Sequence, residues 1–159
     1  MNEKLNIAVF PGSFDPFTIG HESIVNRALP FFDSIIIAIG VNNSKNCLFS
    51  LEKRISIIEK VFHENSKISV KSYSELTVNF CKENNSKVII RGLRTVLDFE
   101  IEQTIAHANK NIQKEIETFF LLTLPEHSFI SSTVFRDLYE YSADFSKLLP
   151  SNISINDLK

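Results

Sequence analysis

The sequence predicts an α/β fold: one domain over residues 1–159, with a five-stranded parallel sheet and helices on both faces. Short apolar, β-branched segments alternate with amphipathic segments along the whole chain. Such alternation is typical of βαβ units with right-handed crossovers, which build a parallel sheet covered on both sides. A chain of 159 residues can also bury about two-thirds of its unfolded surface, so it needs no disulfide or metal to fold.

Five segments have the composition of buried strands: Leu5–Phe10, Ser34–Val41, Ile68–Ser72, Lys87–Ile90 and Thr118–Thr123. In Ser34–Val41 five apolar residues follow one another without a break. A strand that is covered on both faces has this pattern.

Six segments are predicted to be helical: His21–Phe32, Leu51–Phe62, Leu76–Asn84, Leu97–Asn111, Val134–Tyr141 and Asp144–Leu148. Ser50 is a candidate N-cap, with Glu52 in the first turn that follows it, and Ser132 is placed to cap the helix after it. The residues after Pro150 are expected to be weakly structured. Together these elements predict a single Rossmann-like domain.

The composition limits the classes of function. The net charge of −2 gives no general attraction to nucleic acid or to an anionic membrane. Cys47 and Cys81 have no metal-ligand spacing, and the N-terminus lacks the apolar segment of a signal peptide. No apolar run approaches the roughly 20 residues of a membrane helix. We therefore expect a cytoplasmic protein without nucleic-acid or membrane partners.

The stretch FPGSFDPFTIGH at residues 10–21 lies between the first predicted strand and the first predicted helix. It holds two of only four glycines in the chain, Gly12 and Gly20, where backbone must turn sharply or approach a ligand. A helix that starts here directs backbone N–H groups to one point, which suits a phosphate. The stretch carries His21 at the helix start and no lysine.

Polar residues follow several of the strands, and the carboxyl ends of parallel strands meet at one edge of a sheet. This edge would bring together His21, Lys45, Arg91, Arg94 and the hydroxyls of residues 131–133. No P-loop or dinucleotide-binding glycine motif is present, and no nucleophile–histidine pair is suggested. Cations and hydroxyls without a nucleophile favour a transfer reaction in which the substrates react and the protein positions them and stabilises charge.

The same residues carry a resemblance to a known family. Thr18-Ile19-Gly20-His21 resembles the T/HxGH signature of the nucleotidylyltransferase superfamily, and Ile130–Thr133 with Arg136 resembles its ISSTxxR signature. PGSFDPFTIGH, SKNCLF, IRGLR and DFEIE in this order resemble the phosphopantetheine adenylyltransferases. The match runs from about Ile7 to Arg136.

The resemblance implies adenylyl transfer from ATP to 4′-phosphopantetheine with Mg²⁺, giving dephospho-coenzyme A and pyrophosphate. It also implies a cytoplasmic homohexamer with coenzyme A as feedback inhibitor. His21, Lys45 and Arg94 would be catalytic, and no residue is assigned to a metal. Residues matched to phosphopantetheine binding are Ser13, Lys45, Thr77 and Arg91. Residues matched to ATP binding are Ser13, Phe14, His21, Gly92, Leu93, Arg94, Glu102, His127, Ser128, Phe129, Ile130, Ser131, Ser132 and Thr133.

The sequence departs from the family pattern at four positions: Ile19, Asn46, Thr77 and His127. Two other functions are compatible with the motifs. One is a related transferase with another acceptor, such as nicotinamide mononucleotide or glycerol phosphate, against which IRGLR and SKNCLF argue. The other is a protein that senses ATP or coenzyme A without turnover, which the changes at Asn46 and His127 favour.

Overall fold

The computed structural model describes residues 5–42 and 46–158. Its five strands form one parallel sheet in the order β3-β2-β1-β4-β5, which confirms the predicted fold class. The strands are β1 (Ile7–Gly12), β2 (Ser34–Gly40), β3 (Ile68–Tyr73), β4 (Val88–Leu93) and β5 (Glu117–Leu122). The helices are α1 (Ile19–Ala28), α2 (Leu51–Val61), α3 (Thr77–Glu83), α4 (Val96–Ile112) and α5 (Ser132–Glu140). Short 3₁₀ turns occupy Leu29–Phe31, Pro125–His127, Ser146–Leu148 and Ile155–Leu158.

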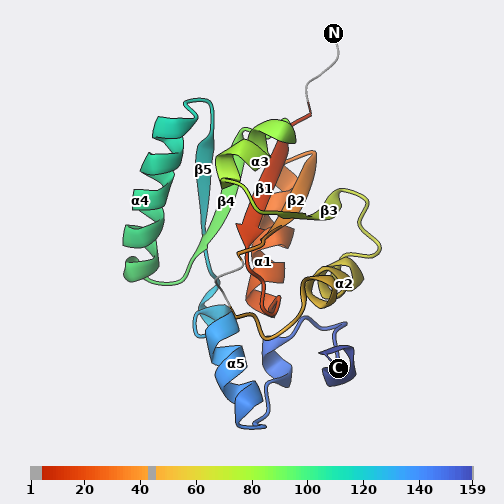
Figure 1. Cartoon of the computed structure of the whole chain (residues 1–159). Coiled ribbons are helices and arrows are strands. Elements are labelled where there is room, and N and C mark those ends of the chain that lie inside the picture. Colours follow the sequence, from red (N-terminus) through yellow and green to blue (C-terminus); the bar gives the residue numbers. More distant parts are fainter. Residues whose placement is uncertain (1–4, 43–45, 159) are drawn as a thin grey trace.

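Helices cover the sheet on both faces (Figure 1). The alternation along β2 shows how: Ile35, Ile37 and Ile39 pack into one apolar core with α1, α2 and α5, whereas Ile36 and Ala38 pack into a second core with α3. The uninterrupted apolar run in this strand is thus explained by burial on both sides, as the sequence predicts. β1 occupies the centre of the sheet, between β2 and β4.

Three strands extend beyond their predicted carboxyl ends: β3 by one residue, to Tyr73, and β1 and β4 by more. β1 continues through Pro11 and Gly12, which pair with Ala38 and Ile39 of β2. β4 continues through Arg91 and Gly92, which pair with Phe120 and Leu121 of β5. Arg91 therefore lies within a strand and not in the loop after it. Glycine and proline, which occur at these ends, are depleted in strands, so pairing with the neighbouring strands and not local propensity determines where β1 and β4 end.

The helix caps agree with the sequence in one case and differ in the other. Ser50 caps α2, since its hydroxyl accepts a hydrogen bond from Lys53 N at 3.2 Å. The cap of α5 is Ser131, whose hydroxyl accepts from Val134 N at 3.1 Å. The prediction of Ser132 as the cap is wrong, because Ser132 is the first helical residue and its hydroxyl is used elsewhere in the fold.

The chain after Pro150 is packed, which corrects the expectation of a weakly structured tail. Ile153 and Leu158 are buried in the larger core, and Asp157 forms an ion pair with Lys60 of α2 at 2.5 Å. The side-chain amide of Asn152 donates to Lys60 O at 3.1 Å. The final turn therefore lies against α2, where Figure 1 places the C-terminus. Within the described residues no helix is long and apolar enough to span a membrane.

The Leu158→Ala variant is expected to lower the free energy of unfolding by about 2–3 kcal/mol, because it leaves a cavity in the core. Urea denaturation followed by circular dichroism measures the change. Ile155→Ala is the matched control in the same turn, because Ile155 is 47% exposed, and it should change stability by less than about 0.5 kcal/mol. Equal effects of the two substitutions would show that the tail does not pack as described.

Candidate active site

Two cavities open at the carboxyl edge of the sheet, and they share part of their walls. The smaller cavity has a volume of about 330 Å³ and the larger one about 790 Å³. Residues 11–13 at the end of β1, together with Arg91 and Glu102, line both. The sequence-based expectation that polar segments meet at this edge is confirmed for the described segments.

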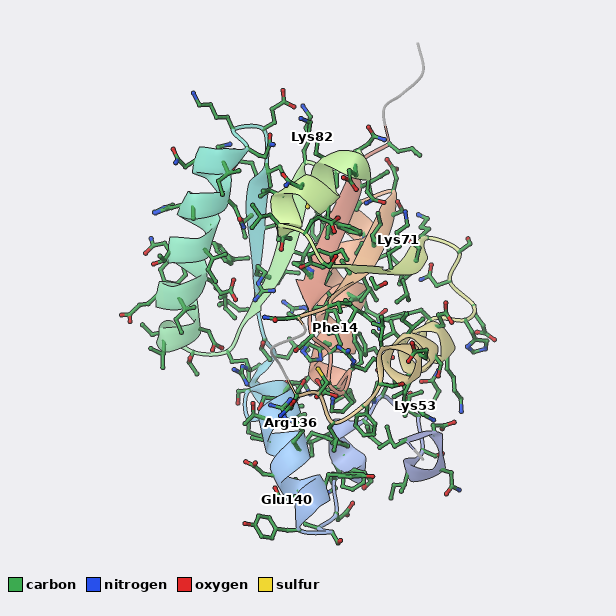
Figure 2. The ribbon with its side chains drawn as sticks, in the orientation of Figure 1. Phe14, Lys53, Lys71, Lys82, Arg136 and Glu140 are labelled. Atoms are coloured by element: carbon green, nitrogen blue, oxygen red, sulfur yellow. The ribbon has the colours of Figure 1, made fainter. Side chains whose placement is uncertain are left out.

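The segment of residues 11–16, which comprises the end of β1 and the loop after it and is here called the motif loop, is held by its carbonyl groups. Four of them accept hydrogen bonds from side chains of other elements: Pro11 O from Arg91 Nη1 at 2.7 Å, Ser13 O from Arg54 Nη1 at 2.7 Å, Asp15 O from Arg136 Nη1 at 2.9 Å, and Pro16 O from Ser132 Oγ at 2.9 Å. Figure 2 shows Phe14 and Arg136 in the region between the end of β1 and α5. The loop is thus fixed from β4, α2 and α5 at once.

Asp15 connects the motif loop to the segment that leads into α2. Its buried carboxylate accepts hydrogen bonds from Leu48 N at 2.7 Å and Phe49 N at 2.9 Å. Asp15 therefore braces the fold and does not face a ligand. Lys45, which the resemblance assigns to substrate binding and catalysis, belongs to residues 43–45, which lie outside the described residues.

His21 is the third residue of α1, and its ring reaches back to the residue that precedes the helix. Nδ1 accepts a hydrogen bond from Thr18 N at 3.0 Å and lies 3.0 Å from Thr18 Oγ1. A ring nitrogen that accepts from a backbone amide carries no proton, so the neutral imidazole holds its proton on Nε2. Phe14 and Phe17 pack against the ring, with centroid distances of 5.1 and 5.3 Å. His21 therefore offers one oriented N–H donor to the smaller cavity, whose wall it helps to form.

Burial, and then the positive charges of Arg94 and Arg91, lower the pKa of His21 from 6.5 to about 4. The imidazole is consequently neutral at physiological pH. In this state the ring carries no charge and can donate a hydrogen bond through Nε2.

Acidification from about pH 6.5 to pH 4 is expected to destabilise the protein through His21. In this range the unfolded chain binds a proton at His21 and the folded chain does not, because the folded-state pKa is about 4. The free energy of unfolding therefore rises with pH across this range, by on the order of 3 kcal/mol, and falls by the same amount on acidification. Urea denaturation at several pH values measures this slope, and His21→Gln should reduce it. An unchanged slope in that variant would contradict the buried neutral state.

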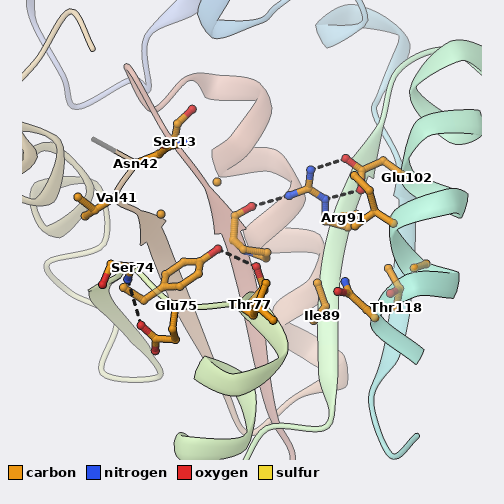
Figure 3. A pocket seen from close by; sticks show the side chains of 18 of the residues that line it. Ser13, Val41, Asn42, Ser74, Glu75, Thr77, Ile89, Arg91, Glu102 and Thr118 are labelled. Carbon is orange, nitrogen blue, oxygen red and sulfur yellow. Dashed lines mark hydrogen bonds and ion pairs between the residues drawn. The ribbon is translucent and has the colours of Figure 1, made fainter. Parts of the chain in front are cut away.

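Arg91 lines both cavities and is held by three hydrogen bonds to two residues. Its Nε donates to Glu102 Oε2 at 2.7 Å, its Nη2 donates to Glu102 Oε1, and its Nη1 donates to Pro11 O. Figure 3 shows this arrangement, with Glu102 projecting from α4 toward Arg91. The guanidinium is thus fixed by the protein itself. Arg91 thus reaches the predicted edge of the sheet, but from within β4 and paired with Glu102.

Arg94 lines the smaller cavity and is held by Asp98 in the first turn of α4. Its Nε and Nη2 donate to the Asp98 carboxylate at 3.1 and 3.2 Å, and its backbone N donates at 3.0 Å. Although burial opposes ionisation, the hydrogen bonds from Arg94 hold the pKa of Asp98 below its usual value. Sequence reasoning missed Asp98, because its role depends on the turn that brings it back to Arg94.

Most residues matched to ATP binding line the smaller cavity: Ser13, Phe14, His21, Gly92, Arg94, Glu102, Ile130, Ser131, Ser132 and Thr133. Phe14 belongs to this wall, although its side chain is only 3% exposed and packs among Phe10, Phe17 and His21. Four other matched residues lie outside both cavity walls: Leu93, His127, Ser128 and Phe129. Leu93 is buried, and the other three belong to the turn between β5 and α5.

The larger cavity lies between α3 and α4. Thr77 lines it, and its hydroxyl lies 2.9 Å from the hydroxyl of Tyr73. Its wall also contains residues that the sequence did not single out: Asn42, Cys47, Tyr73, Leu76, Ile105, Ala106, Asn109 and Thr118. The helical spacing of Glu102, Ile105, Ala106 and Asn109 places them on one face of α4, which is the signal that would have identified them.

The described part of the chain contains no group of three or more His, Cys, Asp or Glu side chains that is placed to hold a metal ion. The two carboxylates of the smaller cavity, Asp98 and Glu102, already pair with Arg94 and Arg91. The described side chains of this cavity therefore do not form a metal site in which the protein supplies all the ligands.

Comparison with known proteins places this site in a family. Residues 9–138 match the family model described as Cytidylyltransferase-like. The phosphopantetheine adenylyltransferase of Leptospira biflexa is 49% identical over 145 residues, which are 91% of either chain. That of Bacteroides thetaiotaomicron is 48% identical over 149 residues, covering 94% of this chain and 98% of its own.

A solved structure, a putative nicotinate-nucleotide adenylyltransferase from Vibrio parahaemolyticus, superimposes with a TM-score of 0.72 over 98% of this chain and all of its own. The two sequences are 17% identical, so this similarity shows only that the two chains share a fold. The family model, which covers both signatures and both cavities, and the two relatives carry the assignment. The chain belongs to the cytidylyltransferase-like family and, within it, to the phosphopantetheine adenylyltransferases.

Proposed function

We propose that this enzyme transfers the adenylyl group of ATP to 4′-phosphopantetheine. A phosphate oxygen of phosphopantetheine attacks the α-phosphorus of ATP. The new P–O bond forms while the bond between the α-phosphorus and the oxygen bridging to the β-phosphate breaks. Pyrophosphate leaves with that electron pair, and dephospho-coenzyme A remains.

The observation that carries the proposal is the wall shared by the two cavities. The end of β1, Arg91 and Glu102 line both of them. Two substrates that occupy separate cavities can therefore bring their phosphates together at this wall. Such positioning supplies much of the rate enhancement in a transfer between two bound substrates.

The smaller cavity suits the triphosphate of ATP. It is lined by the start of α5 with Ser131–Thr133, and by Arg94, Arg136 and His21. A helix N-terminus, hydroxyls and guanidinium groups together favour phosphate oxygens. Charge develops on the oxygen of the leaving pyrophosphate, and a fixed donor such as His21 stabilises it most in the transition state.

The larger cavity suits 4′-phosphopantetheine, which has a phosphate at one end and a long amide-containing arm. Arg91 stands at the inner end, where the phosphate has to lie. Leu76, Ile105 and Ala106 provide an apolar wall, while Thr77 and Asn109 offer hydrogen-bonding groups. Lys45 remains a candidate for the same phosphate. The substrate phosphate is already ionised at neutral pH, so the reaction needs no general base.

We expect Mg²⁺ to bind the phosphates of ATP and to reach the active site together with them. Mg²⁺ keeps several waters and commonly binds substrate phosphates with few protein ligands. This agrees with a cavity whose carboxylates pair with arginines.

Further expectations concern assembly and regulation. No residue of the 17-residue helix α4 is buried, and its apolar residues Val96, Leu97 and Ile101 are exposed. Leu122 at the end of β5 is also 72% exposed. An apolar surface of this kind suits contact with other copies of the chain. We therefore propose a homohexamer in the cytoplasm, with coenzyme A as feedback inhibitor. Light scattering after gel filtration tests the assembly.

The reaction is tested with purified protein, ATP, Mg²⁺ and 4′-phosphopantetheine. Release of pyrophosphate and formation of dephospho-coenzyme A, measured by coupled assay and mass spectrometry, are expected. Nicotinamide mononucleotide and glycerol phosphate serve as alternative acceptors and should give no product. Tight binding of ATP or coenzyme A without pyrophosphate release would instead indicate a sensor and contradict the proposal.

A further inference from the structure

We propose that Arg54 is a positioning residue for this reaction, which holds Ser13 at the wall shared by the two cavities. The inference rests on the proposed function. Arg54 Nη1 donates to Ser13 O at 2.7 Å, and Nε lies 3.4 Å from Ser50 O. Ser13 lines both cavities, so a shift of its peptide alters the placement of both substrates.

Arg54 differs from the other residues that hold the motif loop. Arg91, Ser132 and Arg136 all line the smaller cavity and belong to segments that the family signatures contain. Arg54 is 5% exposed and lies outside both cavity walls. Arg54 therefore lies outside the space in which the substrates would bind, and it acts on them only through its hydrogen bond to the motif loop.

Arg54 has no close ion pair among the described residues, and the nearby acid Glu52, two positions earlier on α2, interacts with it only over a longer distance. Arg91, Arg94 and Arg136 each have a carboxylate within 4.0 Å, whereas no carboxylate of the described residues lies within that distance of Arg54. Burying an unpaired cation is costly unless it is well hydrogen-bonded. Its closest hydrogen bond is to Ser13 O, so the cation and the loop carbonyl stabilise each other. A guanidinium at this place also fixes the direction of the Ser13 peptide.

The test compares kcat and both KM values of the wild type with those of Arg54→Gln and Arg54→Lys. Arg54→Gln is expected to lower kcat about 10–100-fold, because misplacement of the reacting groups costs rate more than binding. Both KM values should stay within about threefold. Arg54→Lys keeps the charge and one donor but loses the planar fork. Its kcat should fall at least about threefold and remain above that of Arg54→Gln.

Lys53→Met is the matched control. Lys53 precedes Arg54 on α2, and its Nζ donates to Asp157 O at 3.2 Å, away from both cavities. Loss of this charge should leave kcat within about twofold of the wild type. Circular dichroism during thermal unfolding gives the folded fraction of every variant at the assay temperature.

Three results would overturn the inference while the wild type is active: a kcat of Arg54→Gln within about twofold of the wild type, a rise of KM alone, or a loss of rate that equals the loss of folded protein. If Arg54→Gln does not fold, a wild-type kcat in Arg54→Lys overturns it. A wild type that releases no pyrophosphate overturns the proposed function and this inference together.

Discussion

Replacement of His21 by alanine is expected to lower kcat by on the order of 10² or more, while the KM values for ATP and phosphopantetheine stay nearly unchanged. His21 presents an Nε2–H donor, because its Nδ1 accepts from Thr18 N. A fixed donor aimed at developing charge contributes mainly to the transition state, and loss of such a donor typically costs 10²–10³ in rate. Steady-state kinetics with each substrate varied in turn measures both parameters.

His63→Ala is the control for this variant, because His63 lies on the exposed turn after α2 and should leave both parameters unchanged. Binding of ATP to His21→Ala, measured by calorimetry, separates the two possible roles. If KM and the dissociation constant rise while kcat is retained, His21 binds the ground state and the proposed transition-state role is wrong.

Replacement of Arg91 by alanine is expected to weaken phosphopantetheine binding by about 10–100-fold, and to weaken ATP binding less. Hydrogen bonds to a charged group contribute about 1.5–3 kcal/mol each, and an ion left unpaired adds a penalty. The substitution removes the cation at the inner end of the larger cavity and leaves the Glu102 carboxylate, which is only 12% exposed, facing the phosphates. Titration calorimetry with each substrate alone gives both affinities.

Two further variants test the reason for this effect. Arg94→Ala should weaken ATP binding more than phosphopantetheine binding, because Arg94 lines only the smaller of the two cavities. Adding Glu102→Gln to Arg91→Ala should recover part of the lost affinity, because it removes the unpaired negative charge. If Arg91→Ala weakens ATP more than phosphopantetheine, Arg91 belongs to the nucleotide site.

The sheet and the place of the site could be predicted from the sequence, because the information is local. The strand at Ser34–Gly40 is a continuous apolar run, and the residues that follow parallel strands must meet at one edge. The details that sequence reasoning missed depend on contacts between distant residues. The tail after Pro150 has too few apolar residues to indicate order, and it is ordered because Ile153 and Leu158 enter a core built by other elements.

Contacts between distant residues also explain what could not be predicted within the active site. Arg91 and Arg94 stand in a recognisable motif, but nothing local shows that Glu102 and Asp98 hold them in place. Arg54 lies in an ordinary amphipathic helix, and only the folded chain reveals its contact with Ser13. Sequence motifs thus identified most residues of the smaller cavity, whereas much of the wall of the larger cavity and the residues that hold the motif loop and the arginines required coordinates.

The hydrogen bonds that shape the motif loop also determine when this site can form during folding. Arg54, Arg91, Ser132 and Arg136 lie 41, 80, 116 and 121 positions from their acceptors in the loop. Contacts between such distant positions form late, after much of the chain has been ordered. If α5 opens locally, two of the four carbonyls lose their partners even where the sheet stays intact, because Ser132 and Arg136 belong to α5. Catalytic activity should therefore disappear earlier in denaturation than the signal of secondary structure.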